Sequence, residues 1–112
     1  MMGACYVRKD CLIVHLPGEL DHFQAEELRK ECDLMCMRHL IRDIIFDFSA
    51  TVFMDSSGIG LILGRLQLMQ QMDGRVYLFG GSPMIRKMWD MAGIMSYVTL
   101  LTTVEEMKEV YE

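Results

Sequence analysis

The segment Phe53–Gly60 carries the side chains best suited to chemistry in this sequence, in the order Phe-Met-Asp-Ser-Ser-Gly-Ile-Gly. Asp55, Ser56 and Ser57 place one carboxylate and two hydroxyls next to each other, and Gly58 follows them. A hydroxyl in such a turn can be a catalytic nucleophile, help to bind a nucleotide, or accept a phosphate. Each of these uses predicts further residues elsewhere in the chain.

Serine catalysis requires a base that contacts the hydroxyl and an acid that orients the base. The three histidines, His15, His22 and His39, stand in no recognisable relation to Ser56 or Ser57 along the sequence. The Gly-x-Ser-x-Gly sequence of a hydrolase nucleophile is also absent. We interpret His15 as structural, and His22 and His39 as solvated near helix ends. The sequence therefore does not predict an enzyme.

Gly58, Gly60 and Gly64 follow a predicted strand in a weak version of a dinucleotide-binding fingerprint. That fingerprint requires an acidic residue about 20 positions further on, where this chain reads Tyr-Leu-Phe-Gly at 77–80. The lysine of a Walker phosphate-binding loop is missing as well. We therefore expect no nucleotide or other cofactor.

Reversible phosphorylation needs only an exposed hydroxyl in a suitable position. Either Asp55 or Ser56 can act as the N-cap of the helix that follows, because its side-chain oxygen can accept an unpaired N–H group. The dipole and the free N–H groups of a helix N-terminus favour an anion, so a phosphate there disturbs the fold little. It would nevertheless add about −1.5 to −2 charges beside Asp55 and alter any partner-binding surface.

Hydrophobic periodicity predicts the elements that position this turn. The Ile-Ile-Phe-Asp-Phe run at Ile44–Phe48 is typical of a buried strand, and Ile59–Met72 has apolar residues at helical spacing. Four more strands are expected, at Ala4–Arg8, Cys11–Leu16, Arg75–Phe79 and Met95–Leu101. The order β-β-α-β-α-β-α-β-α favours one α/β sandwich, with a mixed sheet of about four to five strands and about four helices.

Several residues near the predicted helix ends are of the types that cap helices. They are Asp21 with Gln24 at the first helix, Ser82 with Pro83 at the start of the third, Gly93 at its end, and Thr102 with Glu105 at the last helix. The Gly-Gly-Ser-Pro run at 80–83 is a sharp helix start signal.

The helix after the serines has two faces of different composition at 100° per residue. The face expected to meet the sheet consists of Ile59, Ile62, Leu63, Leu66 and Met69. The opposite face consists of Ser57, Gly60, Leu61, Gly64 and Leu68. This second face is expected either to pack against a neighbouring helix or to form a docking surface beside the serines.

The composition excludes several classes of protein. The 112 residues are enough for one domain with its own core, which we expect to span residues 1–112. A formal net charge of −5 disfavours binding to nucleic acid. No apolar run approaches the roughly 20 residues of a membrane span, and no signal peptide is evident, so we expect a cytoplasmic protein that does not bind membranes.

The four cysteines, Cys5, Cys11, Cys32 and Cys36, are expected to be free thiols. Cys32 and Cys36 are four residues apart in a predicted helix, and no nearby histidine completes a zinc-binding pattern. We interpret all four as small hydrophobic side chains in or near the core and expect no metal site.

Three motifs, in this order, resemble those of the anti-sigma factor antagonists of the STAS domain family. They are Gly18-Glu19-Leu20-Asp21-His22, then Phe53–Gly60 with Leu63-Gly64-Arg65, then Ser82-Pro83 with Arg86-Lys87 and Asp90–Gly93. The resemblance covers nearly the whole chain and is closest to the sporulation sigma-F branch of endospore-forming bacteria. Its most specific part is the Asp-Ser-Ser-Gly turn, while Ile59 and Ala92 replace a common leucine and a common serine.

The resemblance implies a partner-switching protein. The family's phosphoacceptor is the serine directly after the aspartate, which here is Ser56. The unphosphorylated protein is expected to bind an anti-sigma factor that is also a serine kinase, and so to free the sigma factor. That kinase would phosphorylate Ser56 with ATP, and a PP2C-type phosphatase that depends on manganese or magnesium would remove the phosphate.

The expected site residues surround this serine. Asp55, Ser57 and Gly58 would shape the acceptor turn, Leu61 and Gly64 would dock the partner, and Gly18 and Asp21 would support the neighbouring rim. Two alternatives follow from the same motifs: a STAS module of another partner-switching system, such as a stress response, and a STAS module that binds a small ligand. A nucleotide-binding protein is the more distant alternative.

Overall fold

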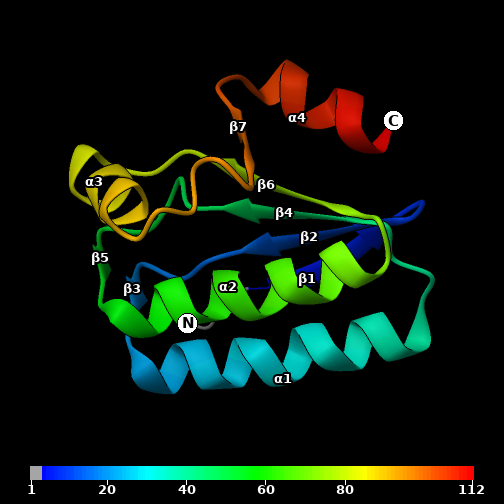
Figure 1. Ribbon diagram of the computed structural model, residues 1–112, viewed down its shortest axis with the longest axis horizontal. Coiled ribbons are helices and arrows are strands. Elements are labelled where there is room, and N and C mark those ends of the chain that lie inside the picture. Colours follow the sequence, from blue (N-terminus) through cyan, green and yellow to red (C-terminus); the bar gives the residue numbers. More distant parts are fainter. Residues whose placement is uncertain (1–3) are drawn as a thin grey trace.

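Five strands form one mixed sheet at the centre of the molecule (Figure 1). The computed structural model describes residues 4–112 of the protein. The strands, in their order across the sheet, are β1 (Ala4–Arg8), β2 (Cys11–His15), β4 (Asp43–Asp47), β6 (Arg75–Phe79) and β7 (Thr99–Leu101). β1 and β2 are antiparallel, and the other neighbours are parallel. The mixed sheet predicted from the sequence is confirmed.

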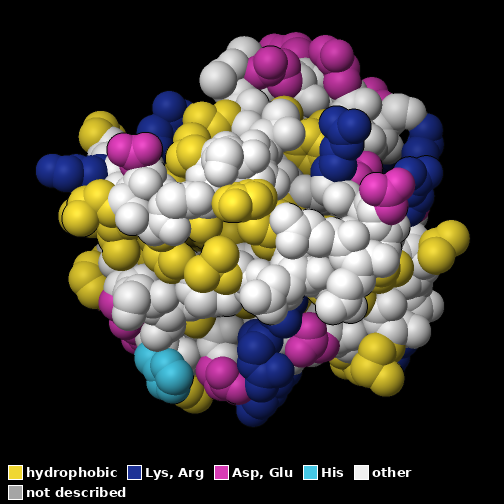
Figure 2. Space-filling view, in the orientation of Figure 1, with side chains coloured by type: hydrophobic (Ala, Val, Ile, Leu, Met, Phe, Trp, Pro, Cys, Tyr) yellow, Lys and Arg dark blue, Asp and Glu magenta, His cyan; other side chains and the backbone are white. Residues whose placement is uncertain are grey.

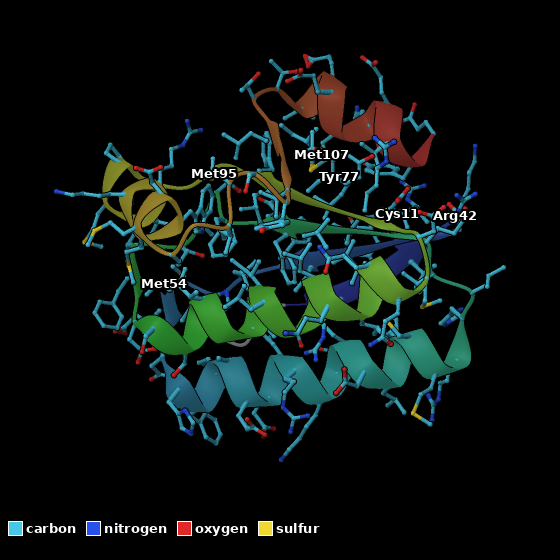
Figure 3. The ribbon with its side chains drawn as sticks, in the orientation of Figure 1. Cys11, Arg42, Met54, Tyr77, Met95 and Met107 are labelled. Carbon is cyan, nitrogen blue, oxygen red and sulfur yellow. The ribbon has the colours of Figure 1, made fainter. Side chains whose placement is uncertain are left out.

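Four helices cover the two faces of this sheet. They are α1 (His22–Arg38), α2 (Ser56–Gln71), α3 (Pro83–Met91) and α4 (Val104–Tyr111). Alternate residues of a strand face opposite sides. Leu12 and Val14 pack in the large core with α1, α2 and α3, whereas Cys11 and Ile13 pack in a smaller cluster with α4. Cys11 and Met107 belong to this smaller cluster, and Tyr77 packs against it (Figure 3).

A second, small sheet brings the N-termini of α1 and α2 together. β3 (Glu19–Leu20) pairs in parallel with β5 (Phe53–Met54). Asp21 follows β3 directly and caps α1, and Asp55 follows β5 directly and caps α2. Because the pairing is parallel, both helices begin at the same end of the molecule (Figure 1). The sequence did not predict these two strands, because two residues are too few for a periodic pattern.

The helix caps follow the sequence closely. Ser82 caps α3 through its hydroxyl, Pro83 is in the first turn, and Gly93 has a left-handed φ of 73° after the end of the helix, all as predicted. The carboxylate of Asp21 accepts a hydrogen bond from the Gln24 backbone N at 2.9 Å. The reciprocal half of this capping box is missing, because Oε1 of Gln24 is buried without a partner among residues 4–112.

The last helix begins one residue later than predicted. Thr103, not Thr102, is its N-cap, and its partner in the capping box is Glu106, not Glu105. The carboxylate of Glu106 accepts hydrogen bonds from the backbone N of Thr102 at 2.8 Å and of Thr103 at 3.1 Å. Glu106 therefore accepts hydrogen bonds from both threonines. The sequence pattern does not show which of the two threonines is the N-cap.

β1 and β6 have the predicted bounds, and the boundaries of the other three strands of the large sheet differ from the prediction by one to four residues. β7 begins at Thr99 rather than at Met95, because residues 95–97 form a turn in which the Tyr97 backbone N donates to the Ile94 carbonyl at 2.9 Å. β2 ends at His15, one residue early, and β4 is shifted by one residue toward the N-terminus.

Candidate functional site

Asp55 and Ser56 define the N-terminus of α2. The carboxylate of Asp55 accepts a hydrogen bond from the Ser57 backbone N at 2.8 Å. Of the two candidates that the sequence allowed, Asp55 and not Ser56 is therefore the N-cap. The Asp55 backbone N donates to the Leu20 carbonyl at 3.3 Å, which fixes the cap to β3. Ser56 is the first helical residue and is exposed. Its hydroxyl therefore lies at the surface, at the positive end of the helix dipole.

Gly58 supports this turn from beneath. It is buried, and a Cβ atom at its position would collide with the Met54 side chain and approach Cδ2 of Leu20 to 3.0 Å. Met54 lies under the start of α2 (Figure 3). A larger residue at position 58 would require the Met54 side chain to move, so glycine lets the first turn of α2 rest on the side chains of β3 and β5.

Gly18 and Asp21 flank β3, which pairs with the strand that leads into α2. The Gly18 carbonyl accepts hydrogen bonds from the backbone N of Val52 at 2.8 Å and of Phe53 at 3.2 Å. The segment before β3 is thereby tied to the segment before α2. Both Gly18 and Asp21 are exposed, so both are open to a partner.

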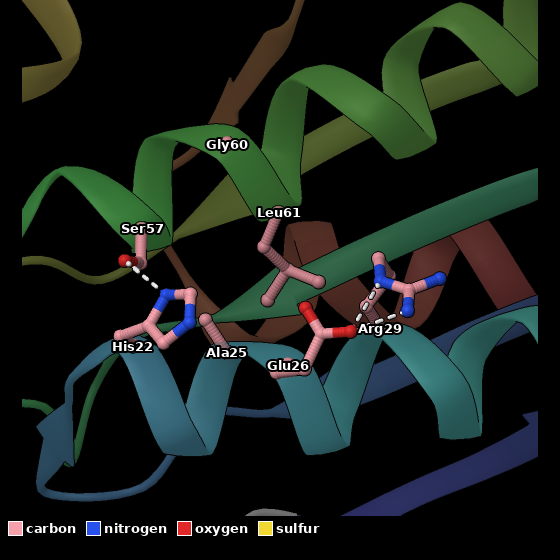
Figure 4. A pocket seen from close by; sticks show the side chains of 7 residues that line it. All are labelled: His22, Ala25, Glu26, Arg29, Ser57, Gly60 and Leu61. Atoms are coloured by element: carbon pink, nitrogen blue, oxygen red, sulfur yellow. Dashed lines mark hydrogen bonds and ion pairs between the residues drawn. The ribbon is translucent and has the colours of Figure 1, made fainter.

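A hollow of about 280 Å³ separates the first turns of α1 and α2 (Figure 4). It is lined by His22, Ala25, Glu26, Arg29, Ser57, Gly60 and Leu61. Nδ1 of His22 lies 3.3 Å from Oγ of Ser57 across this hollow. The prediction that no histidine is related to the serines is therefore wrong for His22 and Ser57. The contact arises from the β3–β5 pairing, which the sequence pattern does not reveal.

Four charged side chains connect the hollow to the middle of α2. Arg29 forms ion pairs with Glu26 and, at 3.2 Å, with Asp33, and Asp33 pairs with Arg65 at 3.3 Å. The hydrogen bond from Arg29 lowers the pKa of Glu26. Arg65 is only 8% exposed, and a buried charge without a partner is costly, so Asp33 holds α1 against α2 here. No pattern in the sequence predicts the burial of Arg65.

The buried face of α2 is wider than predicted. Ile62, Leu66 and Met69 pack in the core as expected. Leu61, on the face predicted either to pack against a neighbouring helix or to dock a partner, is only 4% exposed, and Leu63, predicted to face the sheet, is 39% exposed. The packing alternative therefore holds for Leu61, while its docking role and the direction of Leu63 are wrong, because α2 packs against α1 as well as against the sheet (Figure 1). Leu61 forms part of the lining of the hollow instead of a docking face.

The outward face of α2 begins with the candidate phosphoacceptor. Ser56, Gly60, Leu63 and Gln67 are all exposed, and each follows the one before by three or four residues. We call these four residues the outward stripe. It continues directly from the Ser56 hydroxyl along the helix.

Comparison with known proteins identifies the family. The family model described as the STAS domain matches residues 4–107. The chain belongs to the STAS domain family. The family predicted from the three sequence motifs is thus confirmed.

Two bacterial relatives of this STAS domain are anti-sigma F factor antagonists. The protein of Lysinibacillus sphaericus is 34% identical over 88 residues, which cover 79% of this chain and 75% of the relative. The protein of Paenibacillus polymyxa is 37% identical over 83 residues, which cover 74% of this chain and 71% of the relative.

The solved anti-sigma factor antagonist SpoIIAA has the same fold as this STAS domain. Its unphosphorylated form matches with a TM-score of 0.80 and 29% identity, over 96% of this chain and 94% of that chain. The phosphorylated form from Bacillus matches with a TM-score of 0.79 and 31% identity, over 96% of this chain and 98% of that chain. The predicted fold class is confirmed.

Two glycines of α2 have no steric reason to be glycine within this STAS domain. A Cβ atom at Gly60 or Gly64 would meet no atom of a residue outside its own helix turn within 4 Å. Each glycine in a helix interior is less favourable than alanine by roughly 1 kcal/mol. The two glycines weaken α2 while leaving its surface flat beside Leu63.

Neither a metal centre nor a membrane span is found in the part of the chain that the structure describes. Residues 4–112 contain no cluster of three or more histidine, cysteine or acidic side chains that could hold a metal ion. Within the same residues, every helix is too short or too polar to cross a bilayer. All four cysteines are free thiols, as predicted.

Proposed function

We propose that this STAS domain is an anti-sigma factor antagonist whose binding is switched by phosphorylation of Ser56. Unphosphorylated, it binds an anti-sigma factor and thereby frees the sigma factor for transcription, in the control of sporulation. The observation that carries the proposal is the position of Ser56: exposed, next to the cap Asp55, and at the start of the outward stripe. The relatives from Lysinibacillus sphaericus and Paenibacillus polymyxa and the solved SpoIIAA are anti-sigma factor antagonists, which supports the same function.

The surface around Ser56 has the properties of a protein-binding site. Large apolar side chains are exposed on α2 and on the two elements whose ends meet its N-terminus: Phe23 on α1, Phe53 on β5 and Leu63 on α2. Hydrophobic side chains gather over this end of the molecule, where β5 and α3 lie (Figure 2). Exposed aromatic and aliphatic groups next to a flat helix surface favour close contact with another chain.

The partner is proposed to act on Ser56 as well as to bind it. The anti-sigma factor is a serine kinase that transfers the γ-phosphoryl group of ATP to the Ser56 hydroxyl, and a PP2C-type phosphatase removes it. His22, which lies beside the serines, contacts Ser57 and not Ser56, so the base for this reaction is assigned to the kinase. The STAS domain works as a binding module in the cytoplasm, without a cofactor of its own.

The phosphate is proposed to act locally. It would lie at the N-terminus of α2, where the helix dipole favours an anion, so the backbone has little reason to move. The phosphorylated and unphosphorylated forms of SpoIIAA match this chain equally well, with TM-scores of 0.79 and 0.80. Binding is lost because a dianion beside Asp55 would have to be desolvated in an interface shaped for a neutral hydroxyl.

Phosphorylation with purified components tests this function. Incubation with an anti-sigma F kinase and ATP should add one phosphate, which mass spectrometry maps to Ser56. Ser56→Ala should abolish labelling and change the free energy of unfolding by less than about 0.5 kcal/mol, since Asp55 is the cap. Calorimetry should show binding of the kinase by Ser56→Ala and no binding by the phosphoprotein. Labelling that persists in Ser56→Ala would contradict the assignment.

A further inference from the structure

The two adjacent serines have different surroundings. The Ser56 side chain is exposed on the outward stripe. Ser57 is half-buried, and its Oγ atom lies 3.3 Å from Nδ1 of His22. Figure 4 shows the Ser57 hydroxyl directed across the hollow toward α1. One hydroxyl is therefore free and the other is held by a side chain of the neighbouring helix.

The position of His22 is fixed by the fold. It is the first residue of α1, directly after the cap Asp21. The parallel β3–β5 pair sets the start of α1 beside the start of α2. The imidazole and the Ser57 hydroxyl consequently face each other on two elements that are anchored at the same point.

Phosphoryl transfer is sensitive to this difference. The serine oxygen must lie in line with the γ-phosphorus and the ADP oxygen, as the new P–O bond forms and the old one breaks. The hydroxyl proton passes to a base on the kinase. Ser57 could reach this alignment only by leaving the hollow and giving up its hydrogen bond to His22.

We propose that His22 determines which serine is phosphorylated, by holding the Ser57 hydroxyl in the hollow and leaving Ser56 as the only free acceptor. This inference rests on the proposed function, since it concerns the selectivity of the same kinase reaction. His22 acts as a positioning residue: it touches neither the phosphoryl group nor the kinase base.

The test is made in the Ser56→Ala variant, so that any phosphate added to this turn must be on Ser57. Ser56→Ala alone should show no labelling above background, whereas Ser56→Ala with His22→Ala should be phosphorylated on Ser57 at a rate at least about fivefold above that background, the factor expected for one lost hydrogen bond. His22→Asn should restore protection, because asparagine keeps a hydrogen-bonding atom at the δ position. His39→Ala, an exposed histidine at the other end of α1, is the matched control and should change nothing.

The outcomes separate this inference from the proposed function. A wild-type chain labelled on Ser56, with no labelling of Ser57 in the double variant, overturns the role of His22 and leaves the phosphoswitch intact. A wild-type chain that the kinase does not label overturns both. Independently of any kinase, the imidazole ¹⁵N shifts of His22 should change in Ser57→Ala, and unchanged shifts would contradict the hydrogen bond.

Discussion

Leu61 and Leu63 stand two residues apart on α2 and point in opposite directions: Leu61 packs in the core, and Leu63 faces solvent on the outward stripe. Leu63→Glu should therefore lower the affinity for the anti-sigma factor at least tenfold while changing the free energy of unfolding by less than about 0.5 kcal/mol. Leu61→Ala should instead destabilise the fold by about 2–5 kcal/mol. Calorimetry and urea unfolding measure the two effects.

Leu34→Glu is the matched control for Leu63→Glu. Leu34 is an exposed leucine on α1 with a similar exposed fraction, 44% against 39%. It lies three turns beyond His22 and away from the serines. Full affinity in Leu34→Glu, with reduced affinity in Leu63→Glu, would locate the partner on the outward stripe. Equal affinities in the two variants would remove the stripe from the interface.

Gly60→Ala and Gly64→Ala should each stabilise the protein, by roughly 0.5–1 kcal/mol, because a Cβ fits at both positions and alanine favours the helix. Both should weaken partner binding, if the flat surface is needed for a close approach of the anti-sigma factor. Gly58→Ala is the contrasting variant, since its Cβ would collide with Met54. It should lower the melting temperature. Stabilised glycine variants that bind normally would contradict a role for these glycines in docking.

The cap of α4 should give the protein a local acid sensitivity. Hydrogen bonds from Thr102 lower the pKa of Glu106 in the folded state. A lowered folded pKa contributes stability above the unfolded value, and this contribution is lost as the pH falls below about 4. Glu106→Gln should thus have a lower melting temperature than wild type at pH 7, and the difference should shrink in acid. A difference in melting temperature that does not vary with pH would mean that Glu106 stabilises the cap through its hydrogen-bond geometry and not through its charge.

The Cys11 thiol should not react with alkylating reagents in the folded protein. Burial raises its pKa to about 12, so at pH 8 only about one thiol in ten thousand is ionised. Iodoacetamide should label Cys11 only after unfolding in urea, as mass spectrometry of the native and unfolded chains can measure. Rapid labelling of the native protein would mean that the α4 cluster is open.

Features encoded in a few neighbouring residues were predictable from the sequence. Ser82 with Pro83 and Gly93 set the ends of α3 through local geometry alone. Asp55 as a candidate cap and Ser56 as an exposed hydroxyl were predictable for the same reason, because both features depend only on residues within the same turn. The motifs around them were specific enough to predict the family.

Features that depend on packing between distant segments were not predictable. The directions of Leu61 and Leu63 follow from the place of α1, which no pattern within α2 contains. The contact of His22 with Ser57 depends on two strands of two residues each. The burial of Arg65 depends on its ion pair with Asp33, which lies on another helix.

The division of the apolar residues into two clusters has a consequence for the dynamics of the chain. The large cluster joins α1, α2 and α3 to the sheet, whereas α4 is held mainly by Met107 and Tyr111 against the opposite face. Because so few side chains hold α4 to the sheet, α4 should unfold locally and independently of the rest of the domain. Its amides should exchange with deuterium well before those of β2 and β4, which open only on global unfolding. Fraying of the last helix would leave the turn at Ser56 undisturbed.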